Sequence, residues 1–193
     1  MTTATFLKSA ASPADFPADT GQEVAFVGRS NSGKSTAVNL LAGVRKLARV
    51  SKTPGRTQLV NFFSTGANRR LVDLPGYGFA RVTPEVQARW RRLLEAYLAE
   101  RQSLVGLVLT VDIRRGLTTL DEALLRWIEP RGLAVMILLT KADKLSRGAG
   151  LLRQRQVAEA TPAGTLLTRF SAVSRDGVPE AQAWLKTWLG GTD

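Results

Sequence analysis

Cysteine and histidine are both absent from this chain of 193 residues. Without cysteine the protein can form neither a disulfide framework nor a thiolate metal site. Without histidine it has no imidazole for acid–base catalysis or for metal ligation. Any catalysis must therefore use groups that handle phosphate, carboxylates or a metal ion.

Long hydrophobic runs are lacking as well. No apolar run approaches the ~20 residues that a membrane span requires, and residues 1–8 do not show a basic stretch followed by an apolar core. We therefore expect a soluble, cytoplasmic protein with no membrane span. A hydrophobic content of 44% suits one well-buried domain. We assign this domain to residues 22–190, after an N-terminal lead-in of residues 1–21 with one short strand near residues 5–8.

Acidic residues are few relative to basic ones, since 20 arginines and 7 lysines give a net charge of +11. This excess predicts a polyanionic partner, although an arginine-rich composition across the proteins of the source organism is the alternative explanation. Two segments, residues 43–58 and 144–155, carry basic residues and no acidic ones. Such charges bind phosphate backbones without reading base sequence. The first segment contains Arg45, Lys46, Arg49, Lys52 and Arg56.

The sequence GRSNSGKS at residues 28–35 matches GxxxxGK[ST], the phosphate-binding P-loop. An apolar run at residues 24–27 precedes it and a helix-like segment follows from residue 36, which is the context that the motif needs. Glycines let successive backbone N–H groups point at a phosphate chain. Lys34 is then expected to neutralise β- and γ-phosphate oxygens and the Ser35 hydroxyl to ligate Mg²⁺. The predicted phosphate-binding residues are Gly28, Arg29, Ser30, Asn31, Ser32, Gly33, Lys34 and Ser35.

Three further patterns follow in order. The first, Asp73, Leu74, Pro75 and Gly76, matches the DxxG switch, in which the aspartate holds Mg²⁺ through water and the glycine N–H contacts the γ-phosphate. The second, Thr140, Lys141, Ala142 and Asp143, matches [NT]KxD. A carboxylate at Asp143 accepts hydrogen bonds from guanine N1 and its amino group, whereas adenine leaves it unpaired. The third, Ser171, Ala172 and Val173, follows a predicted strand and places a backbone N–H near guanine O6.

Strands and helices alternate along the chain, which predicts a three-layer α/β fold with a mostly parallel sheet. Each proposed ligand residue follows the end of a strand, where open α/β sheets bind ligands. On the helix at residues 119–129, we place Leu120, Leu124, Trp127 and Ile128 on the inner face. The predicted strands are residues 24–27, 59–64, 70–74, 104–111, 134–139 and 166–170. The other predicted helices after the P-loop helix are residues 83–102, 145–160 and 178–189, and residues 43–57 are predicted to form a mobile loop.

Taken together, the motifs GRSNSGKS, TPGRTQ, DLPGYG, TKAD and SAV resemble the EngB (YihA/YsxC) family of bacterial ribosome-assembly GTPases, in the TrmE-Era-EngA-EngB-Septin-like class. The resemblance spans roughly residues 5–190. It implies a P-loop NTPase of the Ras-like type, a single G domain whose six-stranded sheet contains one antiparallel strand. It also implies GTP and GDP binding, a role in assembly of the large ribosomal subunit and its rRNA, and a need for the protein in cell division and septation.

The resemblance also implies roles for individual residues. Ser35 and Thr57 are the implied Mg²⁺ ligands, and Lys34, Thr57 and Gly76 the implied catalytic residues. Thr57 reaches Mg²⁺ only when its loop closes, so nucleotide state is expected to present or withdraw the basic residues of that loop. The implied effector-loop contacts are Gly55, Arg56, Thr57, Gln58 and Leu59.

Tyr77 stands where Ras-like enzymes carry a glutamine that orients the attacking water. We therefore expect an Mg²⁺-dependent GTPase with low intrinsic activity, and a monomer. Asn31 resembles a P-loop asparagine that coordinates K⁺ in related GTPases, although it is equally suited to bracing the loop. Two alternatives are a GTP/GDP-sensing rRNA-binding module in which hydrolysis is incidental, and an ATPase or nucleotide kinase, which Asp143 argues against.

Overall fold

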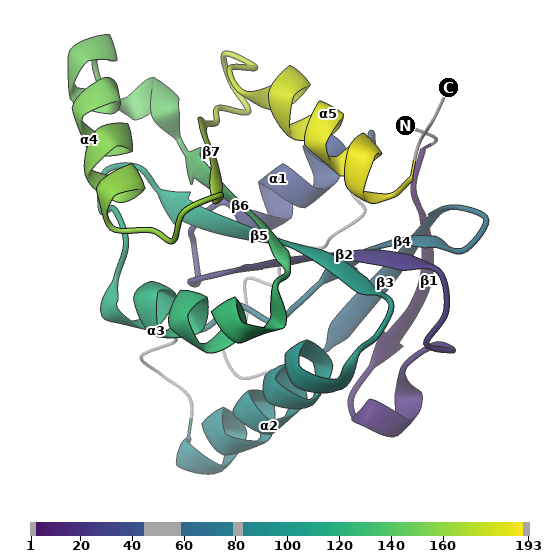
Figure 1. Cartoon of the computed structure of the whole chain (residues 1–193). Coiled ribbons are helices and arrows are strands. Elements are labelled where there is room, and N and C mark those ends of the chain that lie inside the picture. Colours follow the sequence, from purple (N-terminus) through teal and green to yellow (C-terminus); the bar gives the residue numbers. More distant parts are fainter. Residues whose placement is uncertain (1–2, 45–58, 79–82, 191–193) are drawn as a thin grey trace.

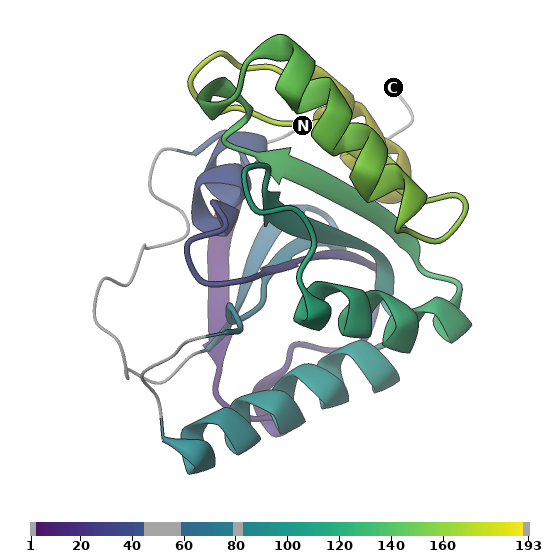
Figure 2. The same ribbon diagram turned by 90° about the vertical axis from the view of Figure 1, so that its left-hand side faces the viewer.

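The structure, a computed structural model, describes residues 3–44, 59–78 and 83–190. Within these residues one sheet is covered by helices on both faces (Figures 1 and 2). Its strands are β1 (Thr5–Ala10), β2 (Gln22–Gly28), β3 (Val60–Gly66), β4 (Arg69–Asp73), β5 (Leu104–Asp112), β6 (Ala134–Thr140) and β7 (Leu166–Arg169). Its α-helices are α1 (Lys34–Leu41), α2 (Pro84–Glu100), α3 (Thr119–Ile128), α4 (Arg147–Glu159) and α5 (Val178–Trp188). Three short 3-10 helices are η1 (Pro13–Asp15), η2 (Glu129–Arg131) and η3 (Ala142–Lys144).

The sheet order is β1-β3-β4-β2-β5-β6-β7. Strands β4, β2, β5, β6 and β7 pair in parallel, while β3 is antiparallel to both of its neighbours. The predicted three-layer, mostly parallel fold with one antiparallel strand is confirmed. The expected count of six strands is wrong, because β1 from the N-terminal lead-in pairs with β3 and makes a seventh. The boundaries of a nucleotide-binding domain at residues 22–190 stay a prediction.

The central strand β2 is apolar on both faces because it separates two cores. Ala25 and Val27 belong to the core beneath α2, α3 and α4, whereas Val24 and Phe26 belong to the core beneath α1 and α5. A strand covered on both faces has no polar alternation, which explains the continuous apolar run in the sequence. Side-chain packing from both sides therefore holds the end of β2, from which the phosphate loop emerges.

Helix α3 is rotated relative to the sequence-based expectation. Leu124 and Ile128 are buried as predicted, but Leu120 and Trp127 are 52% and 43% exposed. Asp121 takes an inward position at 2% exposure, because its carboxylate accepts hydrogen bonds from the Thr118 backbone N–H and hydroxyl and closes the start of the helix. The assignment of Leu120 and Trp127 to the inner face is therefore wrong, and a buried polar residue explains the error.

Several predictions fall on residues that the structure does not describe. The basic loop at residues 43–57 lies outside the described residues except for its first two positions. Helical spacing would place Val86 and Trp90 on the same face of α2 as Leu93 and Tyr97, but their side chains are also outside the described part. Within α2, the described side chains of Leu93, Leu94, Tyr97 and Leu98 are buried. The inner face of the second half of α2 thus follows the helical spacing of the sequence.

Candidate functional site

The P-loop sequence runs from the end of β2 to the start of α1. Asn31 and Gly33 have left-handed backbone angles, with φ of 65° and 92°, and asparagine and glycine are the residues that accept such angles most readily. A Cβ at Gly28 would lie 2.3 Å from Thr110 Oγ1, so only glycine fits there. Lys34 is the first residue of α1, which directs the positive end of this helix toward the loop. This backbone arrangement suits an anion.

Side chains from two neighbouring strands brace the P-loop. The Ser32 hydroxyl is hydrogen-bonded to the Thr110 hydroxyl of β5 at 2.7 Å. The Thr140 hydroxyl at the end of β6 donates to the Ser32 carbonyl, and Lys141 Nζ donates to the Asn31 carbonyl at 2.7 Å. The loop is therefore held in shape by its surroundings, which lowers the cost of ordering it around a ligand.

Lys34 and Asp73 form an ion pair across the site. Both side chains are largely buried, at 11% and 10% exposure, so each balances a charge that would otherwise be costly to bury. A phosphate chain that binds Lys34 must compete with Asp73 for the ammonium group. The two residues that the sequence assigned to phosphate and to Mg²⁺ are thus brought together.

The DxxG segment runs directly beside the P-loop. The Leu74 N–H donates to the Phe26 carbonyl at 3.0 Å, the Tyr77 N–H to the Gly28 carbonyl at 3.2 Å, and the Ser30 N–H to the Tyr77 carbonyl at 2.9 Å. Pro75 is buried between these contacts, and a Cβ at Gly76 would lie 3.3 Å from the Gly28 carbonyl oxygen. The segment from Asp73 to Gly76 therefore lies against the P-loop backbone.

The Tyr77 side chain belongs to the core and not to the phosphate site. Its ring is 5% exposed among core residues beneath α2 and α3, and its hydroxyl donates to the buried Asp121 carboxylate. Burial, together with the Asp121 carboxylate, raises the pKa of Tyr77 far above its ordinary value. In this arrangement the tyrosine does not orient a water at the phosphates. The Thr118-x-x-Asp121 capping pattern was the only sequence signal near this contact.

The TKAD segment leaves β6 at the same edge of the sheet. Lys141 has a left-handed backbone with φ of 59°, which turns the chain so that Asp143 faces the loop after β7. The Ser171 hydroxyl donates to Asp143 Oδ1 at 2.7 Å, and the ammonium of Lys144 lies 3.2 Å from Oδ2. The hydrogen bond from Ser171 lowers the pKa of Asp143. The carboxylate is therefore ionised near neutral pH, as an acceptor for two donors of a base must be.

Ser171 also shapes the loop that carries Ala172 and Val173. It is fully buried, and its Oγ accepts hydrogen bonds from the Val173 and Ser174 N–H groups, both at 3.1 Å. The Ala142 N–H donates to the Phe170 carbonyl at 3.1 Å. The two segments assigned to guanine recognition are thus bonded to each other through Ser171 and Phe170.

The predicted site residues fall into three groups. The first group lies at the carboxyl ends of β2, β4, β6 and β7, where four segments meet. They are the P-loop, Asp73 to Gly76, Thr140 to Asp143 and Ser171 to Val173. Leu59 precedes β3, whose antiparallel direction brings its start to the same edge, since Asn61 pairs with Asp73. Gly55, Arg56, Thr57 and Gln58 lie outside the described residues.

A metal ion at this edge would depend on few protein ligands. Ser35 in the first turn of α1 and Asp73 offer only oxygen, which suits Mg²⁺. Across the described ranges, no three acidic side chains gather as a metal-binding group. Mg²⁺ keeps waters and takes phosphate oxygens in sites of this kind, so the donor set fits an ion bound together with a nucleotide.

Sequence reasoning missed three residues at the end of β5 and just after it. Thr110 braces the P-loop, and Asp112 accepts hydrogen bonds from Lys141 and Arg114. Polar residues at the end of an otherwise apolar strand were the available signal. Outside the site, none of the described helices has both the length and the apolar character to cross a membrane.

Known proteins are similar to this chain in sequence and in fold. The family described as 50S ribosome-binding GTPase matches residues 23–141. The probable GTP-binding protein EngB of Methylococcus capsulatus is 49% identical over 189 residues, which are 95% of this chain and 90% of that protein. The crystal structure of a probable GTP-binding protein EngB has a TM-score of 0.71 at 23% identity and covers 88% of this chain and 100% of that one.

A second solved structure is that of Era with MgGDPNP and nucleotides 1506–1542 of 16S ribosomal RNA. It has a TM-score of 0.68 at 21% identity and covers 86% of this chain and 56% of that one. At such identities, this structure and the preceding one show a shared fold alone.

Proposed function

Since this chain belongs to the EngB family of GTP-binding proteins, we propose that it is a slow, Mg²⁺-dependent GTPase that acts as a nucleotide switch in assembly of the large ribosomal subunit. The observation that carries the guanine preference is the Asp143 carboxylate, oriented by Ser171 at 2.7 Å. Loss of the protein is expected to disturb cell division and septation. We place its action in the cytoplasm, on large-subunit precursors and their rRNA.

The residues of this chain divide the work between binding and sensing. The backbone of the P-loop and Lys34 would bind the phosphates, and Ser35 and Thr57 would hold Mg²⁺, which would neutralise phosphate charge. Gly76 donates its N–H to the γ-phosphate. Thr140 to Asp143 and Ser171 to Val173 read the guanine. The role of Thr57, which lies outside the described residues, rests on the family motifs alone. The other roles rest also on the positions of the residues at one edge of the sheet.

Slow hydrolysis is supported by the burial of Tyr77, whose hydroxyl is bonded to Asp121. The same observation favours the second candidate, a GTP/GDP-sensing rRNA-binding module in which hydrolysis is incidental. The two candidates differ in one outcome. A variant that binds GTP without hydrolysing it blocks subunit assembly if the protein is a switch that depends on hydrolysis. It leaves assembly normal if the protein only senses the bound nucleotide.

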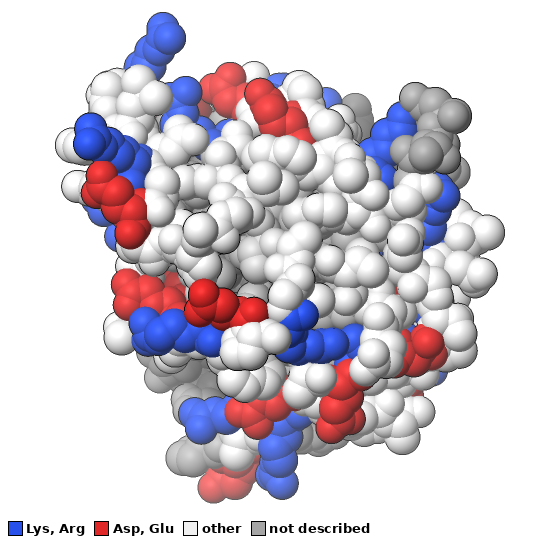
Figure 3. All heavy atoms as spheres, viewed as in Figure 1, with Lys and Arg blue, Asp and Glu red and all other residues white. Residues whose placement is uncertain are grey.

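An rRNA partner is supported by the net charge of +11 and by the family description. On the face shown in Figure 3, basic and acidic side chains alternate, so this face alone does not account for the excess. Residues 43–58 contain five basic residues and no acidic residue. This segment also includes the predicted Mg²⁺ ligand Thr57. Arg45, Lys46, Arg49 and Lys52 are therefore our candidates for nucleotide-dependent contact with rRNA.

We expect the purified protein to sediment with large-subunit precursors more strongly with a non-hydrolysable GTP analogue than with GDP. Substitution of glutamine for four basic residues, Arg45, Lys46, Arg49 and Lys52, should weaken this binding and reduce its salt dependence. Each lost phosphate contact lowers the slope of log affinity against log salt concentration by about one. Glutamine at Arg91 and Arg92, two exposed arginines of α2, is the control. Unchanged binding and nucleotide dependence in the loop variant would sink the proposal.

A bound K⁺ ion is our proposed aid to hydrolysis, motivated by Asn31 in the P-loop. Its left-handed backbone, φ of 65°, and the hydrogen bond that its carbonyl accepts from Lys141 Nζ equally suit a residue that only braces the loop. We expect GTP turnover to be faster in K⁺ than in Na⁺ at equal ionic strength, and Asn31→Ala to remove the difference. Equal turnover in the two salts would leave Asn31 with its bracing role.

A further inference from the structure

Asp112, the last residue of β5, belongs to none of the nucleotide motifs. Its side chain is 6% exposed, and it accepts hydrogen bonds from Lys141 Nζ at 2.9 Å and from Arg114 Nη2 at 2.6 Å, Nε at 3.0 Å and backbone N at 3.1 Å. The bonds from Arg114, and then that from Lys141, hold the pKa of this carboxyl well below its usual range despite burial. Asp112 is therefore a permanent negative charge beside the TKAD segment.

Lys141 connects that charge to the phosphate loop. The same ammonium that meets Asp112 also donates to the Asn31 carbonyl at 2.7 Å, and the preceding Thr140 hydroxyl donates to the Ser32 carbonyl. Lys141 is 32% exposed, so without Asp112 its long side chain is free to turn toward water. We call residues 140–143 the base-reading segment. Its side chains contact the P-loop through two hydrogen bonds, from Thr140 and from Lys141, and the second of these is then lost.

We propose that Asp112 is a positioning residue for nucleotide binding, which anchors Lys141 so that the base-reading segment and the P-loop stay at one separation. This inference rests on the proposed function, because only a ligand with a base at one end and phosphates at the other must engage both segments at once. In this role Asp112 acts through Lys141, whose ammonium it binds, and not by contact with the nucleotide. It acts by reducing the motion of Lys141 that binding would otherwise have to suppress.

Arg114 provides a matched control. Its guanidinium contacts the same carboxylate, but it is 49% exposed and bonds to neither Lys141 nor the P-loop among the hydrogen bonds of the described residues. Removal of Arg114 perturbs Asp112 as a structural element and leaves the Asp112–Lys141 contact in place. A merely structural role of Asp112 therefore predicts similar effects from both substitutions, whereas a positioning role predicts different ones.

The test measures binding of a fluorescent GDP analogue to Asp112→Asn, Arg114→Gln, Lys141→Met and the double variant with Asp112→Asn and Lys141→Met, together with thermal unfolding of each. We expect Asp112→Asn to weaken GDP about ten- to a hundredfold, the range for loss of a hydrogen bond to a charged group. Arg114→Gln should stay within about threefold of the wild type. Asp112→Asn should add little once Lys141 is methionine.

Three results would overturn the inference. They are equal losses in Asp112→Asn and Arg114→Gln, wild-type affinity in Asp112→Asn, and an undiminished Asp112→Asn effect beside Lys141→Met. Asp112→Ser serves as a second variant, and failure of both to fold would show a structural role instead. Failure of the proposed function can be told apart from failure of this inference. If the proposed function is wrong, the wild type will not bind GDP in preference to an ATP analogue.

Discussion

Asparagine in place of Asp143 is expected to lower the affinity for GDP and GTP about a hundredfold or more. In the proposed guanine site this carboxylate would accept hydrogen bonds from two guanine donors, and each hydrogen bond to a charged group contributes about 1.5–3 kcal/mol. The asparagine amide has one oxygen that can accept from the first guanine donor. Its NH₂ group would face the second guanine donor, and two donors cannot form a hydrogen bond with each other. The amide oxygen in the Asp143→Asn variant would still accept from the Ser171 hydroxyl, which donates to Asp143 Oδ1 at 2.7 Å, so the fold should survive.

Xanthosine diphosphate is the matched ligand for this variant. Xanthine carries a carbonyl oxygen where guanine has its amino group, and this oxygen accepts from the asparagine amide. We expect the variant to prefer xanthosine diphosphate over GDP and the wild type to show the reverse order, both measured with fluorescent analogues at equilibrium. Wild-type protein that bound an ATP analogue as tightly as GDP would contradict guanine recognition by the TKAD segment.

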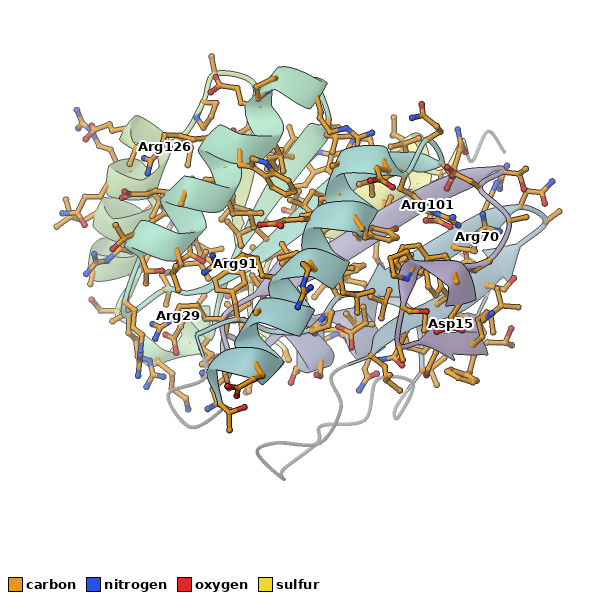
Figure 4. All side chains as sticks on the ribbon, turned by 90° about the horizontal axis from the view of Figure 1, so that it is seen from below. Asp15, Arg29, Arg70, Arg91, Arg101 and Arg126 are labelled. Carbon is orange, nitrogen blue, oxygen red and sulfur yellow. The ribbon has the colours of Figure 1, made fainter. Side chains whose placement is uncertain are left out.

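The second large effect is expected far from the nucleotide, in a buried charge cluster at the amino ends of β2, β4 and β5. Glu23 is fully buried and accepts hydrogen bonds from Arg70 Nε at 2.6 Å, from Arg101 Nε at 2.9 Å and Nη2 at 2.7 Å, and from the Tyr97 hydroxyl at 2.7 Å. Figure 4 shows the two arginines side by side, away from Arg29 of the P-loop. The Glu23 carboxylate is thus shared by two buried guanidinium groups, and Asp19, whose side chain is 35% exposed, adds a second carboxylate 3.5 Å from Arg101 Nε.

The cluster also fastens the N-terminal lead-in. Arg101 Nη1 donates to the Pro17 carbonyl at 2.9 Å and Arg70 Nη2 to the Ala18 carbonyl at 3.1 Å. The guanidinium carbon of Arg101 lies 5.8 Å from the ring centroid of Phe16, a distance that suits a cation–π contact. Loss of Glu23 would therefore loosen residues 16–20 as well as the sheet.

Glu23→Gln is expected to lower the free energy of unfolding by about 3–5 kcal/mol, because buried Arg70 then loses its carboxylate partner and buried Arg101 keeps only the partly exposed Asp19. For a chain of this size, that loss corresponds to a melting temperature lower by roughly 10 °C, measured by differential scanning calorimetry.

Arg155→Ala is the control for Glu23→Gln. Arg155 pairs with Glu159 at 3.0 Å on α4, but both side chains are mostly exposed, at 81% and 65%, so the expected change is at most about 0.5 kcal/mol. Equal melting temperatures for Glu23→Gln and Arg155→Ala would show that the buried cluster contributes no more than a surface pair.

The tertiary structure decided features that no local pattern contained. Hydrogen bonds join Glu23 to Arg101, Tyr77 to Asp121 and Asp112 to Lys141, and these pairs are 78, 44 and 29 residues apart in the sequence. Buried Asp121 also set the rotation of α3, which exposes Leu120 and Trp127. Strand β1 joined the sheet although its first three residues are exposed, because the edge of β3 offered backbone hydrogen bonds and apolar burial was not required.

By itself, the sequence determined the order of the motifs, the alternation of strands and helices, and hence the edge of the sheet where the site residues meet. These features depend on contacts between residues near one another in the chain, such as the turn from β2 through the P-loop to α1, and their spacing is legible in the residue order. Only the folded chain decided which charged side chains meet across the sheet. Such pairs form wherever burial brings opposite charges together, and burial depends on the packing of elements far apart in the sequence.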